Sequence, residues 1–212
     1  MSPKKQYYQN ISTTLINNFK KRNIEGFYCD TKEKALNKAL SYLSKDQLIG
    51  YGGSMTLNEI GLIKKIEEDP KYNVLSKNNA KTKEEKEKLY LDAFHSNVYF
   101  MSSNAITLDG QLVNIDGNGN RVAALIYGPK QVIIIAGMNK LVPSVDEAIN
   151  RIQNFATPPN SNRLNLETPC TKTGKCEDCL SKDCICCEIV ITRKSRHDGR
   201  IKVILVGENL GY

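Results

Sequence analysis

The stretch KQVIIIAG, residues 130–137, decides the fold of this chain. Its apolar residues follow one another without the alternation of a strand that has one face in water. Such a run is typical of a parallel strand whose two faces are both covered. The sequence therefore predicts a buried sheet, and the chain on either side of this strand has to supply the helices that cover it.

Helical and strand patterns alternate on the N-terminal side of this strand. In residues 7–23, apolar side chains return at helical spacing, among them Ile11, Leu15 and Phe19. At residues 47–69 a short apolar run leads into two glycines and then into a helix, which is the building unit of α/β proteins. We therefore expect an open, mostly parallel α/β sheet flanked by helices. The expected strands are 24–29, 47–53, 97–103 and 130–137, and the expected helices are 7–23, 31–45, 54–69 and 144–156.

Three further segments complete the expected layout. Residues 67–90 carry many charges of both signs, which predicts a surface strand and an exposed helix, not a binding tract. The segment TPPNSNRLN, 157–165, is a proline- and asparagine-rich breaker. Two strands around the polar turn RHDG, 196–199, are expected to close the chain as a pair. We expect residues 1–160 to form the α/β core, and residues 161–212 to form a cysteine-rich loop and the closing strand pair of the same domain.

The composition limits the classes of function. The chain has 212 residues and 40% hydrophobic content, enough for one substantial core. It has no apolar run of membrane-helix length, and its N-terminal MSPKKQYYQN lacks the apolar core of a signal peptide. We expect a soluble, cytoplasmic protein with reduced thiols and no membrane partner. The formal charge is +7, but the lysines are spread and Trp is absent, so nucleic-acid binding is not favoured.

The glycine turn YGGS is the first candidate binding element. Gly52, Gly53 and Ser54 lie between an expected strand and an expected helix, where free backbone N–H groups can hold a phosphate or a carboxylate. The alternative is purely structural, since Thr56 and Glu59 have the T-x-x-E spacing of a capping box and the glycines suit a tight turn.

The second candidate is the polar loop SSNAITLDGQLVNIDGNGNR, residues 102–121. Asp109 or Asp116 can serve as a general base there, and Arg121 can pair with an anion. Calcium is excluded because the downstream Glu of a calcium loop is missing. The structural alternative is a pair of Asp-Gly turns, with LDGQL as a hairpin.

Six of the seven cysteines lie between Cys170 and Cys187. Cys176 and Cys179 form a C-x-x-C pair, whose spacing lets two thiolates reach one metal ion from a tight turn. A second pair at Cys184 and Cys187 gives the ligand set C-x2-C-x4-C-x2-C. Reduced structural thiols, a redox pair and disulfides are the alternatives to a metal.

Four stretches together resemble the lactate-utilisation domain family, also called the LUD or DUF162 family. They are GGSMTLNEIGL, the long segment SSNAITLDGQLVNIDGNGNRVAALIYGPKQVIIIAGMNK, PPNSNRLN and TGKCEDC. The resemblance covers the chain from about residue 45 to its end. It implies a fold similar to the CoA-transferase and ribose-5-phosphate isomerase group, in which ligands sit at the glycine turn and at acidic loops on strand ends.

The resemblance also implies a site and a role. The glycine turn and the polar loop would face each other across one pocket. The family is linked to the oxidation of L-lactate to pyruvate, beside partner subunits that carry iron–sulfur clusters. The expected catalytic residues are Asp116, Asp109 and Glu59, and the expected ligand-binding residues are Gly52, Gly53, Ser54, Thr56, Asn104, Thr107, Asn118 and Arg121.

The family's cysteine pattern points to a second ligand set. The pattern matches Cys170, Cys176, Cys179 and Cys186. The rival set is Cys176, Cys179, Cys184 and Cys187. Four thiolates suit either zinc or a 4Fe–4S iron–sulfur cluster, and the family's partners favour the cluster.

The leading expectation is a component of lactate-type 2-hydroxy acid oxidation that binds a small anionic metabolite and carries a cysteine-bound metal. Two other classes stay open. One is a zinc-stabilised binding module whose basic tail, TRKSRHDGRIK, contacts a partner subunit or nucleic acid. The other is an isomerase or transferase that acts on a phosphorylated or CoA-linked substrate.

Overall fold

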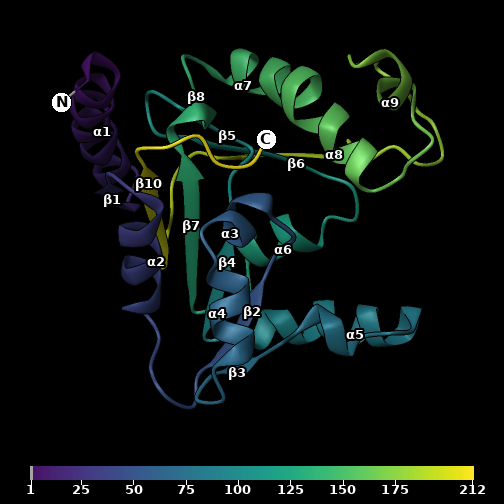
Figure 1. Ribbon diagram of the computed structural model, residues 1–212, viewed down its shortest axis with the longest axis horizontal. Coiled ribbons are helices and arrows are strands. Elements are labelled where there is room, and N and C mark those ends of the chain that lie inside the picture. The colour runs from purple at the N-terminus through teal and green to yellow at the C-terminus, as the bar shows by residue number, and fades with distance from the viewer. Residues whose placement is uncertain (1) are drawn as a thin grey trace.

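The computed structural model describes residues 2–212 and contains two sheets (Figure 1). The larger sheet has the strand order β1-β10-β7-β4-β2-β3, and all its neighbouring strands are parallel. Its central strand is the apolar run quoted above. The expected α/β sheet is thereby confirmed. The strands are β1 (Glu25–Cys29), β2 (Leu48–Tyr51), β3 (Asn73–Val74), β4 (Val98–Met101), β7 (Gln131–Gly137) and β10 (Ile201–Val206).

Helices cover both faces of this sheet, as the run of apolar residues in β7 requires. Ile134 packs in the cluster that faces α1 and α6, and Ile133 packs in the cluster that faces α2, α3 and α4. Both side chains are fully buried, and each such burial contributes about 1.5–3 kcal/mol to stability. These helices are α1 (Pro3–Lys21), α2 (Lys32–Leu40), α3 (Met55–Glu59), α4 (Leu62–Glu68) and α6 (Asn120–Ile126).

The second sheet has the order β8-β5-β6-β9. Its β5–β6 hairpin turns at the segment LDGQ, as the hairpin reading predicted. One face contributes Ile106 and Leu112 to the main core, and the other packs on α7 through residues such as Val113. The elements are β5 (Ala105–Thr107), β6 (Leu112–Asp116), β8 (Leu141–Val142), β9 (Glu188–Thr192) and α7 (Val145–Arg151).

The expected closing strand pair is wrong, because β9 and β10 belong to different sheets. β9 pairs antiparallel with β6, whereas β10 lies between β1 and β7 in the parallel sheet. The physical reason is burial. Every residue of β10 is buried, and such a strand needs cover on both faces, which only the interior of the large sheet provides.

The expected break at residues 157–165 is also wrong. Thr157–Arg163 forms the helix α8, which continues from α7 through a π-helical turn, η4 (Ile152–Ala156). Pro158 and Pro159 directly follow the π-helical turn, where the regular i→i−4 hydrogen-bond pattern is already interrupted, so the helix accommodates their missing N–H groups.

The remaining elements are short or peripheral. The charged segment forms a two-residue edge strand and the exposed helix α5 (Lys83–Asp92), which projects from the body in Figure 1 and confirms the surface reading. Among the described residues, no helix is long and apolar enough to cross a bilayer. The other short helices are η1 (Lys77–Asn79), η2 (Ala93–His95), η3 (Met138–Lys140) and α9 (Pro169–Thr173).

Gly137 at the end of β7 allows a close crossing of the backbone. A Cβ atom at this position would lie 2.6 Å from both Glu208 O and Leu210 N. We therefore expect Gly137→Ala to lower the free energy of unfolding by about 2 to 3 kcal/mol. Urea unfolding monitored by circular dichroism measures this change. Gly53→Ala is the matched control, since its Cβ would meet only the Lys77 amine, at 3.5 Å; equal losses in the two variants would contradict the packing argument.

Candidate functional site

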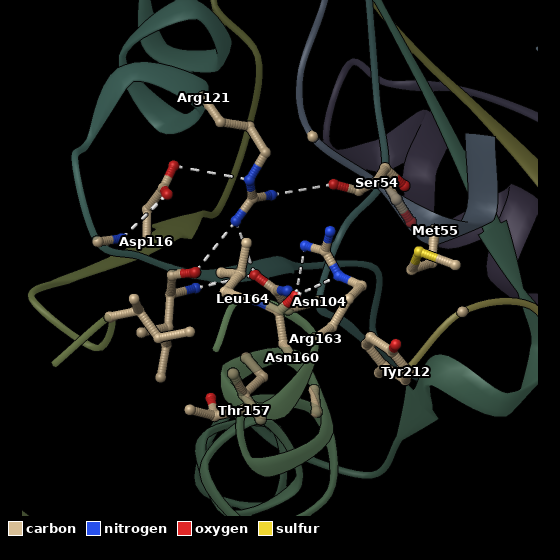
Figure 2. Close-up of a pocket in the computed structure, with 18 of the residues that line it drawn as sticks. Ser54, Met55, Asn104, Asp116, Arg121, Thr157, Asn160, Arg163, Leu164 and Tyr212 are labelled. Atoms are coloured by element: carbon tan, nitrogen blue, oxygen red, sulfur yellow. Dashed lines mark hydrogen bonds and ion pairs between the residues drawn. The ribbon is translucent and has the colours of Figure 1, made fainter. Parts of the chain in front are cut away.

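A pocket of about 260 Å³ lies where the parallel strands β2 and β4 end at their carboxyl sides. Ligands of open α/β sheets commonly bind at this edge. Figure 2 shows side chains around it, and the lining residues come from six segments of the chain. These are the turn Gly53–Met55, the loop residues Ser102, Asn104 and 115–121, the helical segment 152–164 with Lys140, and a wall made by Cys184, Ile185, Gly211 and Tyr212.

Arg121 organises one side of the pocket. Its Nη1 donates to Ser102 O and Asn114 Oδ1, and its Nη2 donates to Asn104 Oδ1 and Ile115 O, at 2.6–3.1 Å. Its Nε lies 3.6 Å from Asp116 Oδ2. Burial lowers the pKa of Arg121, and the charge of Asp116 opposes this. All its N–H groups are engaged by the protein, so Arg121 holds the loop in place.

Asp116 is similarly occupied. Its carboxylate accepts N–H bonds from Gly117 and, at the start of α6, from Val122, in addition to the pairing with Arg121. The side chain still lines the pocket. Because these bonds fix the loop and the start of a helix, removing the carboxylate would disturb the fold as well as any ligand.

Asn104 lines the pocket, and within residues 2–212 only the oxygen of its side-chain amide is bonded to the protein. Its Oδ1 accepts N–H bonds from Arg121 and from the backbone of Ile115. These two bonds fix the orientation of the amide. Since no bond of its Nδ2 is recorded among the described residues, the amide N–H groups of Asn104 are available in the pocket.

The sequence reasoning missed Lys140, which lies three residues after β7 in η3 and is only 4% exposed. Its Nζ lies 3.0 Å from both Thr56 Oγ1 and Ser102 Oγ, and no carboxylate of the described residues forms an ion pair with it. Burial lowers the pKa of Lys140 to about 7, and the charges of Arg151 and Arg121 act in the same direction. In the sequence, the feature that could have indicated this residue is its position directly after a buried strand.

A second amine, from the charged segment that was expected to have no binding role, lies beside Gly53 of the pocket lining. The Nζ of Lys77 lies 3.5 Å from the position of a Cβ on Gly53. Burial lowers the pKa of Lys77, while the nearby charge of Asp116 raises it and that of Arg163 lowers it. The pocket therefore contains more positive than negative charge.

The alternative in which Thr56 and Glu59 form a capping box is wrong. Ser54 is the N-cap of α3 and accepts the N–H of Leu57 at 3.4 Å. Because Ser54 supplies the cap, Thr56 and Glu59 are free to bind the chain near residue 210: Thr56 donates to Leu210 O, and Glu59 accepts the N–H of Gly211.

The cysteine loop forms the remaining wall. Cys184 and Ile185 line the pocket, and the N–H of Cys187 donates to Asp116 O at 3.1 Å. The thiol of Cys186 lies 3.5 Å from Thr157 Oγ1 on α8. The loop is thus packed directly against both the acidic loop and the helical wall.

The chain matches the family model of the LUD domain over residues 13–206. It belongs to the LUD domain family. A crystal structure of a DUF162 family protein from Deinococcus radiodurans is similar over 94% of this chain and 98% of that one, with a TM-score of 0.52 and 12% identity. This likeness concerns the fold alone.

Two enzyme structures resemble this LUD domain over about half of each chain. Ribose 5-phosphate isomerase A from Neisseria gonorrhoeae covers 54% of both chains, with a TM-score of 0.35 and 19% identity. Ribose 5-phosphate isomerase from Plasmodium falciparum covers 53% of this chain and 52% of that one, with a TM-score of 0.34 and 20% identity. No curated protein matches the chain.

The LUD domain brings only part of the expected site together. Asp109 pairs with Arg22 of α1 at 2.5 Å and bonds to Thr107, so both lie at the turn of the β5–β6 hairpin, outside the pocket. Gly52 packs against the stem of Arg121, where a Cβ would lie 2.9 Å from Cγ. The expected residues that line the pocket are Gly53, Ser54, Asn104, Asp116, Asn118 and Arg121; those that do not are Gly52, Thr56, Glu59, Thr107 and Asp109.

The cysteine side chains suit a metal by chemistry but are not gathered around one point. Within residues 2–212, no three His, Cys, Asp or Glu side chains lie close enough to hold an ion. Yet Cys176 Sγ accepts the N–H of Asp178 and Cys184 Sγ accepts the N–H of Cys186, both at 3.4 Å. Such bonds stabilise thiolates. Hydrogen bonds to Ser181 lower the pKa of Cys179, whereas burial raises the pKa of Cys186 to about 11.

The buried amine of Lys140 makes stability depend on pH. Its folded-state pKa is about 7 and its ordinary value is 10.5, so the unfolded chain binds the extra proton between these limits. We expect Lys140→Met to raise the free energy of unfolding by on the order of 2 kcal/mol below pH 7. The gain should shrink between pH 7 and about 10.5, because the folded wild type is neutral there and the free-energy cost of deprotonating the unfolded chain falls to zero as the pH approaches 10.5.

Urea unfolding of both proteins across this pH range measures the difference. Lys172→Met, at an exposed lysine of α9, is the control and should change stability equally at every pH. A gain for Lys140→Met that does not vary with pH would show that burial does not depress the pKa of Lys140.

Proposed function

We propose that this LUD domain binds a small anionic metabolite in the pocket beside the glycine turn. The observation that supports this most directly is the buried, carboxylate-free amine of Lys140. A buried charge without a partner is unfavourable, and an anionic ligand would supply the missing partner. Lys77 and Arg163 add further positive charge, while Asp116, the acid in the lining, is already paired with Arg121.

The size and the donors of the pocket favour a short acid. Its volume of about 260 Å³ lies below the range of pockets that take drug-sized ligands. The free Nδ2 of Asn104 and the guanidinium of Arg163 can donate to a carboxylate, which planar groups recognise well. A 2-hydroxy or 2-oxo acid is the ligand class that we favour, with phosphorylated or CoA-linked compounds as the rival class.

We further propose that this protein takes part in lactate-type oxidation, and its membership of the LUD domain family supports this. Converting a 2-hydroxy acid to a 2-oxo acid removes two electrons and two protons. The pocket lining binds and orients the acid, and the electrons pass to a partner subunit that carries iron–sulfur clusters. This requires a complex, and the exposed Leu180 at the tip of the cysteine loop offers one apolar contact for it.

Ligand-induced stabilisation tests the pocket. We expect lactate, pyruvate or phosphate to raise the melting temperature of the full chain, because a ligand that binds only the folded state stabilises it by RT ln(1 + [L]/Kd). Lys140→Met and Lys77→Met should each lose most of the shift, and Lys172→Met should keep it. Absence of a shift with every anion in the wild type would sink the assignment.

We also propose that the cysteine loop holds zinc or an iron–sulfur cluster, and the two N–H···S bonds at Cys176 and Cys184 are the observation in favour. Ligation requires the loop to draw together, since its thiols are not gathered in this conformation. The two candidate sets share Cys176 and Cys179. No step of the binding chemistry above depends on this metal.

Anaerobic purification followed by metal analysis and an absorption spectrum tests the loop. We expect about one zinc ion or one brown, iron-containing cluster per chain, and loss of the metal in Cys176→Ser. Cys29→Ser is the control, because Cys29 is buried at the end of β1, away from the loop. A protein that is free of metal after anaerobic purification and reconstitution would contradict metal binding by the cysteine loop. The remaining roles of the cysteines would be structural or redox roles of the thiols.

A further inference from the structure

When the amine of Lys140 is neutral, the hydrogen bonds around it leave the nitrogen lone pair free. Thr56 Oγ1 donates its proton to Leu210 O, and Ser102 Oγ donates to Ser103 O. Both hydroxyls therefore accept from Lys140 Nζ, at 3.0 Å each. A neutral amine has two N–H groups, and these two hydroxyls engage both. The fourth tetrahedral position of the nitrogen then carries an unbonded lone pair, on a side chain that lines the pocket.

The surroundings favour this neutral form. The side chain of Lys140 is only 4% exposed. The nearby cations Arg151 and Arg121 lower its pKa, and the carboxylate of Glu59 acts in the opposite direction. The carboxylate of Glu59 accepts the backbone N–H of Gly211 and forms no ion pair with the amine in the described chain. Desolvation and a neighbouring cation are the two conditions that activate a lysine as a nucleophile.

We propose that Lys140 is a nucleophile that forms an imine with the carbonyl carbon of a 2-oxo acid bound in this pocket. The inference rests on the proposed binding of a small acid and adds a covalent step to it. The geometry behind it is the pair of hydroxyls that leave the lone pair exposed, in a cavity whose other donors suit a carboxylate. Arg163 and the free Nδ2 of Asn104 are those donors.

The step balances without a further reactant. The nitrogen lone pair forms a bond to C2 of the oxo acid while the π electrons of the carbonyl move to its oxygen. A proton passes from nitrogen to that oxygen, which gives a neutral carbinolamine. The hydroxyl group of the carbinolamine then leaves with the second proton of the nitrogen as water, and a C=N bond replaces the C=O bond. A 2-hydroxy acid has no carbonyl, so it binds without this reaction.

Reductive trapping tests the proposal. The full chain is incubated with pyruvate and sodium cyanoborohydride near neutral pH, and the modified lysine is identified by peptide mass mapping. We expect Lys140 to be labelled about tenfold faster than an exposed lysine such as Lys172, as an activated amine should be. Lactate in place of pyruvate should give no adduct. Lys172→Met is the matched control, because it removes an exposed lysine of α9 outside the pocket and should leave the label on Lys140.

The outcomes separate this inference from the proposed function. If lactate and pyruvate both raise the melting temperature but Lys140 stays unlabelled, the amine is a cationic binding group and the inference is wrong, while the pocket assignment stands. If no anion raises the melting temperature and Lys140 is unlabelled, both fail. Labelling spread evenly over surface lysines also overturns the inference. Mapping of the wild type decides these cases even if Lys140→Met or Lys140→Arg does not fold.

Discussion

The buried guanidinium of Arg121 is the interaction on which the candidate site depends. One side chain on α6 binds the end of β4, the loop at Asn104 and two residues of β6, and it pairs with Asp116. Five donors in a planar fork can satisfy four separate acceptors and a carboxylate at once, which no other side chain can do. The amide of Asn104, the acidic loop and the Gly52 turn are all positioned by it. The pocket exists because this charge is buried and compensated.

The cysteine loop contacts two walls of the pocket, the acidic loop and the helical wall. The backbone of Cys187 bonds to Asp116, whose side chain pairs with Arg121, and Cys186 contacts Thr157 of the helical wall. Gathering thiols around a metal would have to move residues that also line the pocket, such as Cys184. Metal occupancy and ligand binding are therefore physically linked in the proposed function, although neither requires the other.

Local patterns predicted the elements, while distant contacts decided where the functional groups lie. The apolar run of β7 predicted a strand covered on both faces, because burial of consecutive residues permits little else. The place of β10 beside it depends on pairing with β1, far away in the chain, and no local signal reports this. The spacing of Asp109 and Asp116 likewise did not reveal that the β5–β6 hairpin separates them. Asp109 lies beside the end of α1, and Asp116 lines the pocket. Lys140 was missed because burial of a lysine is a tertiary property.

The position of β10 has a consequence for the folding of the chain during its synthesis. Domains usually fold as units while the chain emerges from the ribosome. Here β1 and β7 have no common neighbour until residues 201–206 are released, since β10 lies between them. From the synthesis of β7 (Gln131–Gly137) until that of β10, the nascent chain therefore carries two open, apolar strand edges. Such edges can pair with other chains, so the release of β10 closes the sheet and removes this route to aggregation.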